Sequence, residues 1–198
     1  MSYQIVKTSY ESACIVPHSP YTDWCSHLYN ISNLNEKSII ELGLGLGTKV
    51  LLEHFKEVFS FEVVNTDEWY KKSVEDYKSY TNWKHQFFFM KEFGLDVTDT
   101  ELLNSGGLSR NVEPLKKYFH ALEVFLPTIA KMDVALVDQG FHFRGETVSY
   151  FLEKQIPIVI AHDTYNHDQI YGYDKIVMPD NYTKETYGRL GTTIYTRQ

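Results

Sequence analysis

Residues 38–47 read SIIELGLGLG, and this stretch decides the fold that we predict. A short apolar run ends in Gly43, Gly45 and Gly47, and residues 48–52 then read as the start of a helix. A strand, a glycine loop and a helix in this order bring bare backbone against a nucleoside-bearing ligand in α/β proteins. Glycine suits such a loop because it tolerates positive φ and has no Cβ to obstruct the ligand. The spacing is neither the GxGxxG dinucleotide fingerprint nor a phosphate-binding P-loop.

An acidic residue, Glu41, stands two positions before the first glycine and completes the pattern E-x-G-x-G-x-G. This pattern resembles the first motif of the class I S-adenosylmethionine-dependent methyltransferases. Residues 57–64, EVFSFEVV, agree with it, since they read as a second strand with Glu62 near its end. In that family an acidic residue at this place binds the ribose hydroxyls of the cofactor, and one carboxylate can accept from two vicinal hydroxyls. The resemblance implies that S-adenosylmethionine is bound by Glu41, Gly43, Gly45, Gly47 and Glu62.

A second block near the C-terminus is similar to a small-molecule or sugar O-methyltransferase branch of the same family. That branch has a pattern near V-D-G-x-H-x-Y-x-G, then a helix, a strand and H-D-T. Residues 132–138, MDVALVD, end in Asp138, and residues 156–164 read IPIVIAHDT. His142 departs from the pattern, because it follows Asp138 by four residues instead of about three.

Methyl transfer to a hydroxyl requires placement of the oxygen, removal of its proton and exclusion of water. His142 is our candidate general base, since an ordinary histidine pKa of about 6.5 suits proton abstraction near neutral pH. Asp138 is the second candidate catalytic residue. Arg144 follows in the same segment and could pair with a carboxylate or with Glu146. A purely structural loop histidine is the alternative for His142.

A divalent ion could instead bind the acceptor oxygen and lower its pKa. The resemblance implies acidic metal ligands at Asp138 and Asp163, and Mg²⁺ favours carboxylate oxygens. His162 stands where some members have a second acidic residue or Asn, and imidazole suits Mn²⁺ better than Mg²⁺. Asp138, His162 and Asp163 are therefore candidate ligands of Mg²⁺ or Mn²⁺. The alternative is that the two carboxylates only order backbone and water at the strand ends.

The resemblance implies a Rossmann-like class I methyltransferase fold of the α/β class. Such a fold has a mostly parallel seven-stranded sheet, helices on both faces and an antiparallel C-terminal strand pair. The pattern predicts strands at 38–42, 58–64, 86–90, 132–137, 156–161, 174–177 and 192–195, and helices at 48–56, 67–79, 114–125 and 145–154. We expect residues 1–37 to be a lead-in segment that covers the cofactor mouth or caps the sheet, and residues 38–198 to be one domain.

The charge and composition of the chain disfavour some classes of partner and location. The chain has 198 residues and a net charge of −7, which disfavours nucleic acid as a partner. It also lacks the N/D-P-P-Y/F tetrad of base-amino methyltransferases. We expect no membrane span, since no apolar run reaches 18 residues, and a cytoplasmic location, since no signal peptide is evident. Two cysteines predict no disulfide scaffold.

Our first hypothesis is an S-adenosylmethionine-dependent O-methyltransferase that acts on a small hydroxylated acceptor, with a sugar or glycan favoured over a catechol. A metal-bearing hydroxylase or hydrolase on the same fold is the enzyme alternative. A cofactor-binding module without catalytic activity is the alternative outside the enzymes. A nucleic-acid methyltransferase is the third hypothesis. A homodimer is compatible with each of these.

Overall fold

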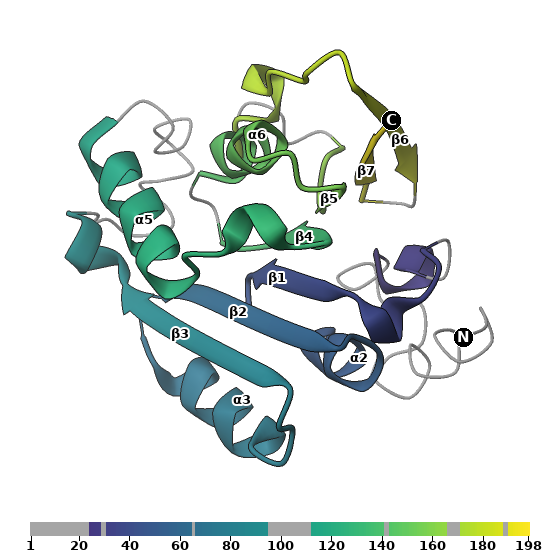
Figure 1. Cartoon of the computed structure of the whole chain (residues 1–198). Helices are drawn as coiled ribbons and strands as arrows, with labels where there is room; N and C mark the ends of the chain where they lie inside the picture. Colours follow the sequence, from purple (N-terminus) through teal and green to yellow (C-terminus); the bar gives the residue numbers. More distant parts are fainter. Residues whose placement is uncertain are drawn as a thin grey trace.

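The computed structural model describes residues 24–28, 31–64, 66–94, 112–140, 143–165, 171–187 and 190–198. They are organised around one seven-stranded sheet with the order β3-β2-β1-β4-β5-β7-β6 (Figure 1). The strands are β1 (Ser38–Leu42), β2 (Glu57–Val64), β3 (Trp83–Phe89), β4 (Val134–Val137), β5 (Ile158–Ala161), β6 (Tyr182–Tyr187) and β7 (Thr192–Arg197). The first five strands run parallel, whereas β7 pairs antiparallel with both β5 and β6. This sheet confirms the predicted Rossmann-like α/β arrangement with an antiparallel C-terminal pair.

Helices cover both faces of the sheet. On one face lie α2 (Thr48–His54) and α3 (Glu68–Tyr77), and on the other lie α5 (Val112–Phe125) and α6 (Arg144–Glu153). The short 3-10 helices are η2 (Leu34–Glu36), η3 (Met90–Phe93), η4 (Ile129–Lys131), η5 (Tyr173–Lys175) and residues 24–28. None of the helices in these described ranges has the length and apolar character needed to cross a membrane.

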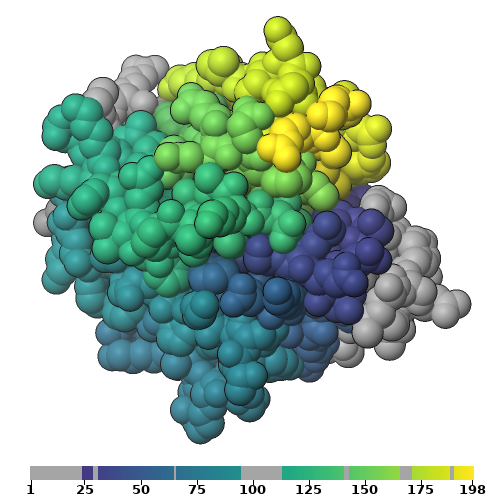
Figure 2. Space-filling view, viewed as in Figure 1, coloured from purple at the N-terminus to yellow at the C-terminus, as the bar shows by residue number. Residues whose placement is uncertain are grey.

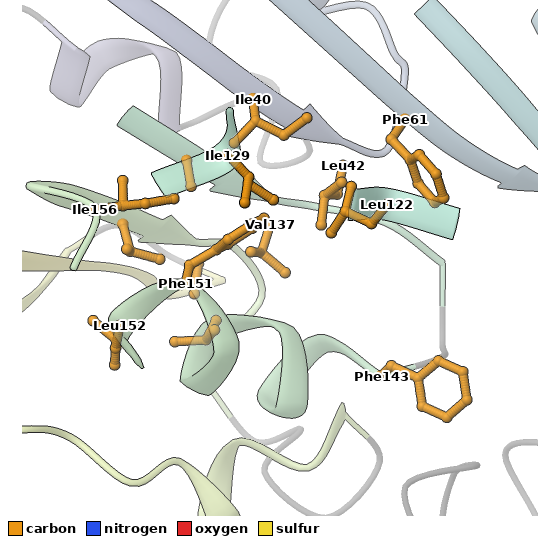
Figure 3. Packing of buried hydrophobic residues seen from close by; sticks show 14 of the residues in the cluster. Ile40, Leu42, Phe61, Leu122, Ile129, Val137, Phe143, Phe151, Leu152 and Ile156 are labelled. Atoms are coloured by element: carbon orange, nitrogen blue, oxygen red, sulfur yellow. The ribbon is translucent and has the colours of Figure 1, made fainter. Parts of the chain in front are cut away.

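The sheet separates two hydrophobic cores, because neighbouring residues of a strand point to opposite faces. Ile40 and Leu42 of β1 pack on the α5 and α6 side with Leu122 and Phe151 (Figure 3), whereas Ile39 packs on the α2 side. All five residues of β1 are buried, as expected of a central parallel strand that is covered on both faces. Full burial of one Ile or Leu contributes about 1.5–3 kcal/mol, so burial stabilises the strand that carries the glycine loop.

The prediction of a strand at 174–177 is wrong. These residues belong to η5 and the segment after it, and the sixth strand is β6, within a stretch that reads as polar and turn-rich. β6 lies at an edge of the sheet, and four of its six residues are exposed. An edge strand can carry polar and charged residues, so its sequence YTKETY has no apolar run to reveal it. The strand predicted at 86–90 also differs, since β3 begins at Trp83.

Residues 24–28 pack against the sheet. Trp24, Cys25 and Leu28 are buried in the core on the α2 side. The ring of His27 stacks on Tyr187 of β6 with a centroid distance of 4.7 Å. In the space-filling view, the purple N-terminal elements accordingly lie beside the yellow C-terminal strands (Figure 2). Most of the predicted lead-in, residues 1–23, lies outside the described residues.

Candidate functional site

The predicted site residues gather at the carboxyl-terminal end of the parallel strands. The parallel strands β1, β2, β4 and β5 have their carboxyl ends at this end of the sheet, where open α/β sheets bind ligands. Glu41 lies in β1 and Glu62 in β2, while Asp138 directly follows β4 and His162 directly follows β5. Four residues that are far apart in the sequence are thereby brought to the same end of the sheet.

Two glycines of the loop after β1 allow close contacts within the protein. Gly43 has φ +99°, and a Cβ there would lie 2.3 Å from the main-chain oxygen of Asp138. A Cβ on Gly47 would lie 2.3 Å from the ring atom Cζ2 of Trp24. Both positions therefore require glycine because other parts of the chain occupy the space of a side chain.

Gly45 differs from these two glycines. Among the described residues, nothing lies within 4 Å of the position that a Cβ would take there. Its neighbourhood is nevertheless ordered: the Gly45 N–H donates to Thr48 Oγ1 at 2.9 Å, and Trp69 Nε1 donates to the Leu44 oxygen at 2.8 Å. The loop thus presents ordered backbone at Gly45 with room for a ligand to lie against it.

The buried carboxylate of Glu41 supports this loop through hydrogen bonds. It is 1% exposed, and it accepts hydrogen bonds from Thr48 Oγ1 at 2.8 Å and from Ser60 Oγ at 2.7 Å. Trp83 Nε1 donates to the same Ser60 hydroxyl at 2.9 Å. Burial raises the pKa of Glu41 to about 8. Glu41 therefore anchors the start of α2 to β1 and β2.

Glu62 links the end of β2 to the glycine loop. Its Oε2 accepts a hydrogen bond from the Leu44 N–H at 2.6 Å, and its Oε1 accepts from the Val63 N–H at 3.0 Å. Burial raises the pKa of Glu62 to about 7, although both N–H groups oppose this shift by stabilising the carboxylate. The carboxylate is therefore fixed beside the loop, where the family resemblance expects a ribose.

A second cluster lies at the ends of β4 and β5. Asp138 Oδ1 is 3.1 Å from His162 Nδ1, and Asp163 Oδ1 is 3.4 Å from the same nitrogen. Arg144, the first residue of α6, places NH1 3.2 Å from Asp163 Oδ2 and 3.6 Å from Asp138 Oδ1. Asp163 has φ 58°, a left-handed conformation that is uncommon for a non-glycine residue and that clusters at functional sites. The pairing of Arg144 with carboxylates is one of the two alternatives that the sequence leaves open.

Buried contacts hold the Arg144 side chain in this place. Its Nε donates to the Gly140 oxygen at 3.1 Å, and NH1 also donates to the His162 oxygen at 3.1 Å. The guanidinium carbon lies 4.2 Å from the ring centroid of Tyr171. Burial opposes the charge, but the neighbouring Tyr173 and the carboxylates keep the pKa of Arg144 above its ordinary value.

The donors of the proposed metal site can be tested on this geometry. One ligand atom from each of Asp138, His162 and Asp163 lies within 4.8 Å of the others, which is close enough to surround one ion. His162 Nδ1 faces a carboxylate oxygen on two sides, which favours a proton on that nitrogen and leaves it no lone pair for a metal. The Arg144 guanidinium already supplies a positive charge to both carboxylates. In this arrangement the three residues do not fit a divalent ion.

His142 lies outside the described residues, so its role as a general base stays a prediction. Other site residues carry no recognisable sequence signal. Trp24 Nε1 donates to Asp138 Oδ2 at 3.2 Å, and the Tyr173 hydroxyl donates to the His162 oxygen at 2.6 Å. Ser60 supports Glu41 from the middle of β2. These contacts depend on how distant segments pack, which a single sequence does not reveal.

No protein-family model and no curated protein matches the sequence. Among solved structures, an rRNA methylase from Streptococcus thermophilus aligns with a TM-score of 0.50 and 14% identity, covering 83% of this chain and 89% of that chain. The fibrillarin pre-rRNA processing protein of Methanococcus jannaschii aligns with a TM-score of 0.49 and 9% identity, covering 90% and 76%. TYW2 of M. jannaschii in complex with AdoMet aligns with a TM-score of 0.43 and 10% identity, covering 93% and 80%. The rRNA methylase shows that this fold is shared with a methyltransferase.

Proposed function

We propose that this chain is an S-adenosylmethionine-dependent O-methyltransferase that acts on a hydroxyl of a small acceptor, a sugar or a glycan. The observation that carries the proposal is the pairing of the buried Glu62 carboxylate with the Leu44 N–H, beside open backbone at Gly45. A fixed carboxylate next to an accessible glycine loop suits a ligand that has both a ribose and a charged amino acid part.

The cofactor half of the proposal uses residues with distinct tasks. When bound, S-adenosylmethionine supplies the methyl group that is transferred. Gly45 leaves room for the ligand against the loop, and Glu62 offers carboxylate oxygens to the ribose hydroxyls. Glu41 is 1% exposed, and its two oxygens bind the hydroxyls of Thr48 and Ser60. Its part is to keep the loop in the shape that admits the ligand.

The acceptor half of the proposal uses the polar residues at the carboxyl ends of β4 and β5. Asp138 and His142 would orient the acceptor hydroxyl and take its proton as the methyl group arrives. A cleft of about 160 Å³ has Thr164, the residue after Asp163, in its lining, and most of its lining side chains carry a hydroxyl. It is lined by Thr164, Tyr165, Tyr173, Lys184, Thr186, Thr193 and Tyr195. Hydroxyls can both donate and accept hydrogen bonds, which supports a polyhydroxylated acceptor over an aromatic one.

Calorimetric titration of the full chain with S-adenosylmethionine and S-adenosylhomocysteine tests the cofactor half. We expect micromolar binding to the wild type and at least a tenfold loss in Gly45→Val, whose side chain would enter the open space. Leu46→Val is the matched control, since it introduces the same side chain at an exposed neighbour. Equal melting temperatures would show that both variants are folded. No binding to the wild type would overturn the proposal.

Transfer of a labelled methyl group to a panel of monosaccharides, oligosaccharides, catechols and ribosomal RNA tests the acceptor half. We expect label on a sugar and none on RNA, because the net charge of −7 repels a polyanion. His142→Gln should then lower kcat about 10²–10⁴-fold without changing cofactor affinity. Cofactor binding without transfer to any acceptor would favour the non-catalytic module.

A further inference from the structure

We propose that the guanidinium of Arg144 takes the place of a divalent ion between Asp138 and Asp163, so that the site works without a metal. The exclusion of metal follows from contacts within this chain alone. The consequence for methyl transfer rests on the function proposed above.

One positive charge lies beside both carboxylates. Arg144 NH1 lies 3.2 Å from one oxygen of Asp163 and 3.6 Å from one oxygen of Asp138, so a single cationic group contacts both carboxylates. A metal that bridged the same two carboxylates would sit a few ångströms from this guanidinium in a poorly solvated place. Like charges at such a distance repel each other strongly when water does not screen them.

The Arg144 side chain cannot easily leave this position. Arg144 is 5% exposed, and its N–H groups also satisfy two main-chain oxygens, those of Gly140 and His162. Moving the guanidinium away to admit an ion would deprive these oxygens of a donor. It would also separate the guanidinium from the face of the Tyr171 ring.

The surrounding backbone is packed closely around this arginine. A Cβ on Gly145, the next residue of α6, would lie 2.0 Å from the main-chain oxygen of Gly172. The absence of a side chain at Gly145 therefore lets the segment with Tyr171 and Tyr173 approach α6. That approach brings the Tyr171 ring over the guanidinium, and the Tyr173 hydroxyl binds the same His162 oxygen as Arg144.

These contacts make Arg144 a positioning residue. It orients the two carboxylates at the ends of β4 and β5 and compensates part of their charge. A bound metal ion would otherwise have these two roles. The side chains of Asp138 and Asp163 remain about one-fifth exposed, so they can still meet an acceptor. His162, held between them, completes the set without acting as a ligand.

Binding of Mn²⁺ to the full chain, measured from the loss of the free-ion signal in electron paramagnetic resonance, tests the inference. The wild type should bind no Mn²⁺ at micromolar concentration. Arg144→Ala should bind one equivalent, because the carboxylates of Asp138 and Asp163 then lack a competing cation. This gain should disappear in Arg144→Ala combined with Asp163→Asn. Arg197→Ala is the matched control, since Arg197 is exposed and lies at the end of β7, and it should behave as the wild type.

Two results would overturn the inference. One is a Mn²⁺ site in the wild type that Asp163→Asn abolishes, and the other is a folded Arg144→Ala that binds no Mn²⁺. If Arg144→Ala does not fold alone, Arg144→Gln keeps hydrogen-bond donors for the main-chain oxygens, and the same gain of one Mn²⁺ is expected. Because these titrations contain no S-adenosylmethionine, failure of the proposed function leaves their outcome unchanged. If methyl transfer is found, a chelator should leave the wild-type rate within twofold.

Discussion

The Glu62 carboxylate accepts a 2.6 Å hydrogen bond from the main-chain N–H of Leu44, so the end of β2 is tied directly to the loop after β1. The second oxygen of the same carboxylate accepts from the Val63 N–H at 3.0 Å. Two main-chain donors fix the carboxylate in one orientation. The loop and the acidic side chain are therefore held in a fixed position relative to each other.

Replacing Glu62 by Gln should weaken binding of S-adenosylmethionine at least tenfold. The amide keeps the shape of the side chain but removes the charge, and hydrogen bonds to charged groups contribute about 1.5–3 kcal/mol. Calorimetric titration at a pH above the Glu62 pKa of about 7, where the wild-type side chain is charged, measures the change. Glu68→Gln is the control, because Glu68 is an exposed acidic residue at the start of α3. Equal affinities of the two variants would show that Glu62 does not contact the ligand.

The glycines of the loop should respond unequally to alanine. Gly43→Ala should lower the free energy of unfolding by about 3 kcal/mol or more, since it adds strain at φ +99° to a clash with the Asp138 backbone. Gly45→Ala should change stability by less than about 1 kcal/mol, because a Cβ there meets open space among the described residues. Urea unfolding followed by circular dichroism compares the two. A similar loss in both variants would contradict the assigned geometry.

The free energy of unfolding should fall as the pH rises from about 5 to 8. Burial raises the pKa of Glu41 to about 8 in the folded chain, while the unfolded value is 4.5. Between these values the folded state holds a proton that the unfolded state has released, so rising pH favours unfolding. One such proton corresponds to about 1.4 kcal/mol per pH unit.

Glu41→Gln should reduce this slope, which is measured by urea unfolding at several pH values. Part of the slope should remain below pH 7, because burial also raises the pKa of Glu62, to about 7. Glu53→Gln on the exposed side of α2 should leave the slope as in the wild type. An unchanged slope in Glu41→Gln would mean that this carboxyl is already ionised at pH 5.

The central strands and the glycine loop could be predicted because their signals are local. β1 is buried on both faces, so its sequence is an apolar run, and the glycines that follow mark the turn into α2. The positions of Glu41 and Glu62 in the site could be predicted because Glu41 lies two positions before the first glycine of the loop and Glu62 lies in the next strand. The parallel order then brings Asp138 and His162 to the same edge.

The remaining parts depend on long-range packing or on exposure. β6 has a polar sequence because it is an edge strand, so its pattern resembles a loop. The sequence leaves Arg144 with either a carboxylate or Glu146 as partner, and only the packing of α6 against the end of β5 decides between them. Trp24 reaches Asp138 from 114 residues away, and no spacing rule connects two such positions.

Trp24→Phe should test whether the N-terminal segment belongs to the site. The indole Nε1 donates to Asp138 Oδ2 at 3.2 Å, and the ring fills the space above Gly47. Phenylalanine keeps an aromatic ring but removes the donor, so we expect a loss of about 1–3 kcal/mol in the free energy of unfolding. A double-mutant cycle with Asp138→Ala, which removes the acceptor, measures the coupling between the two side chains, and residues in contact show a coupling of about 0.5–3 kcal/mol. Additive losses would mean that Trp24 contributes only by packing, whereas coupling would make residues 24–28 a wall of the site that helps to orient Asp138.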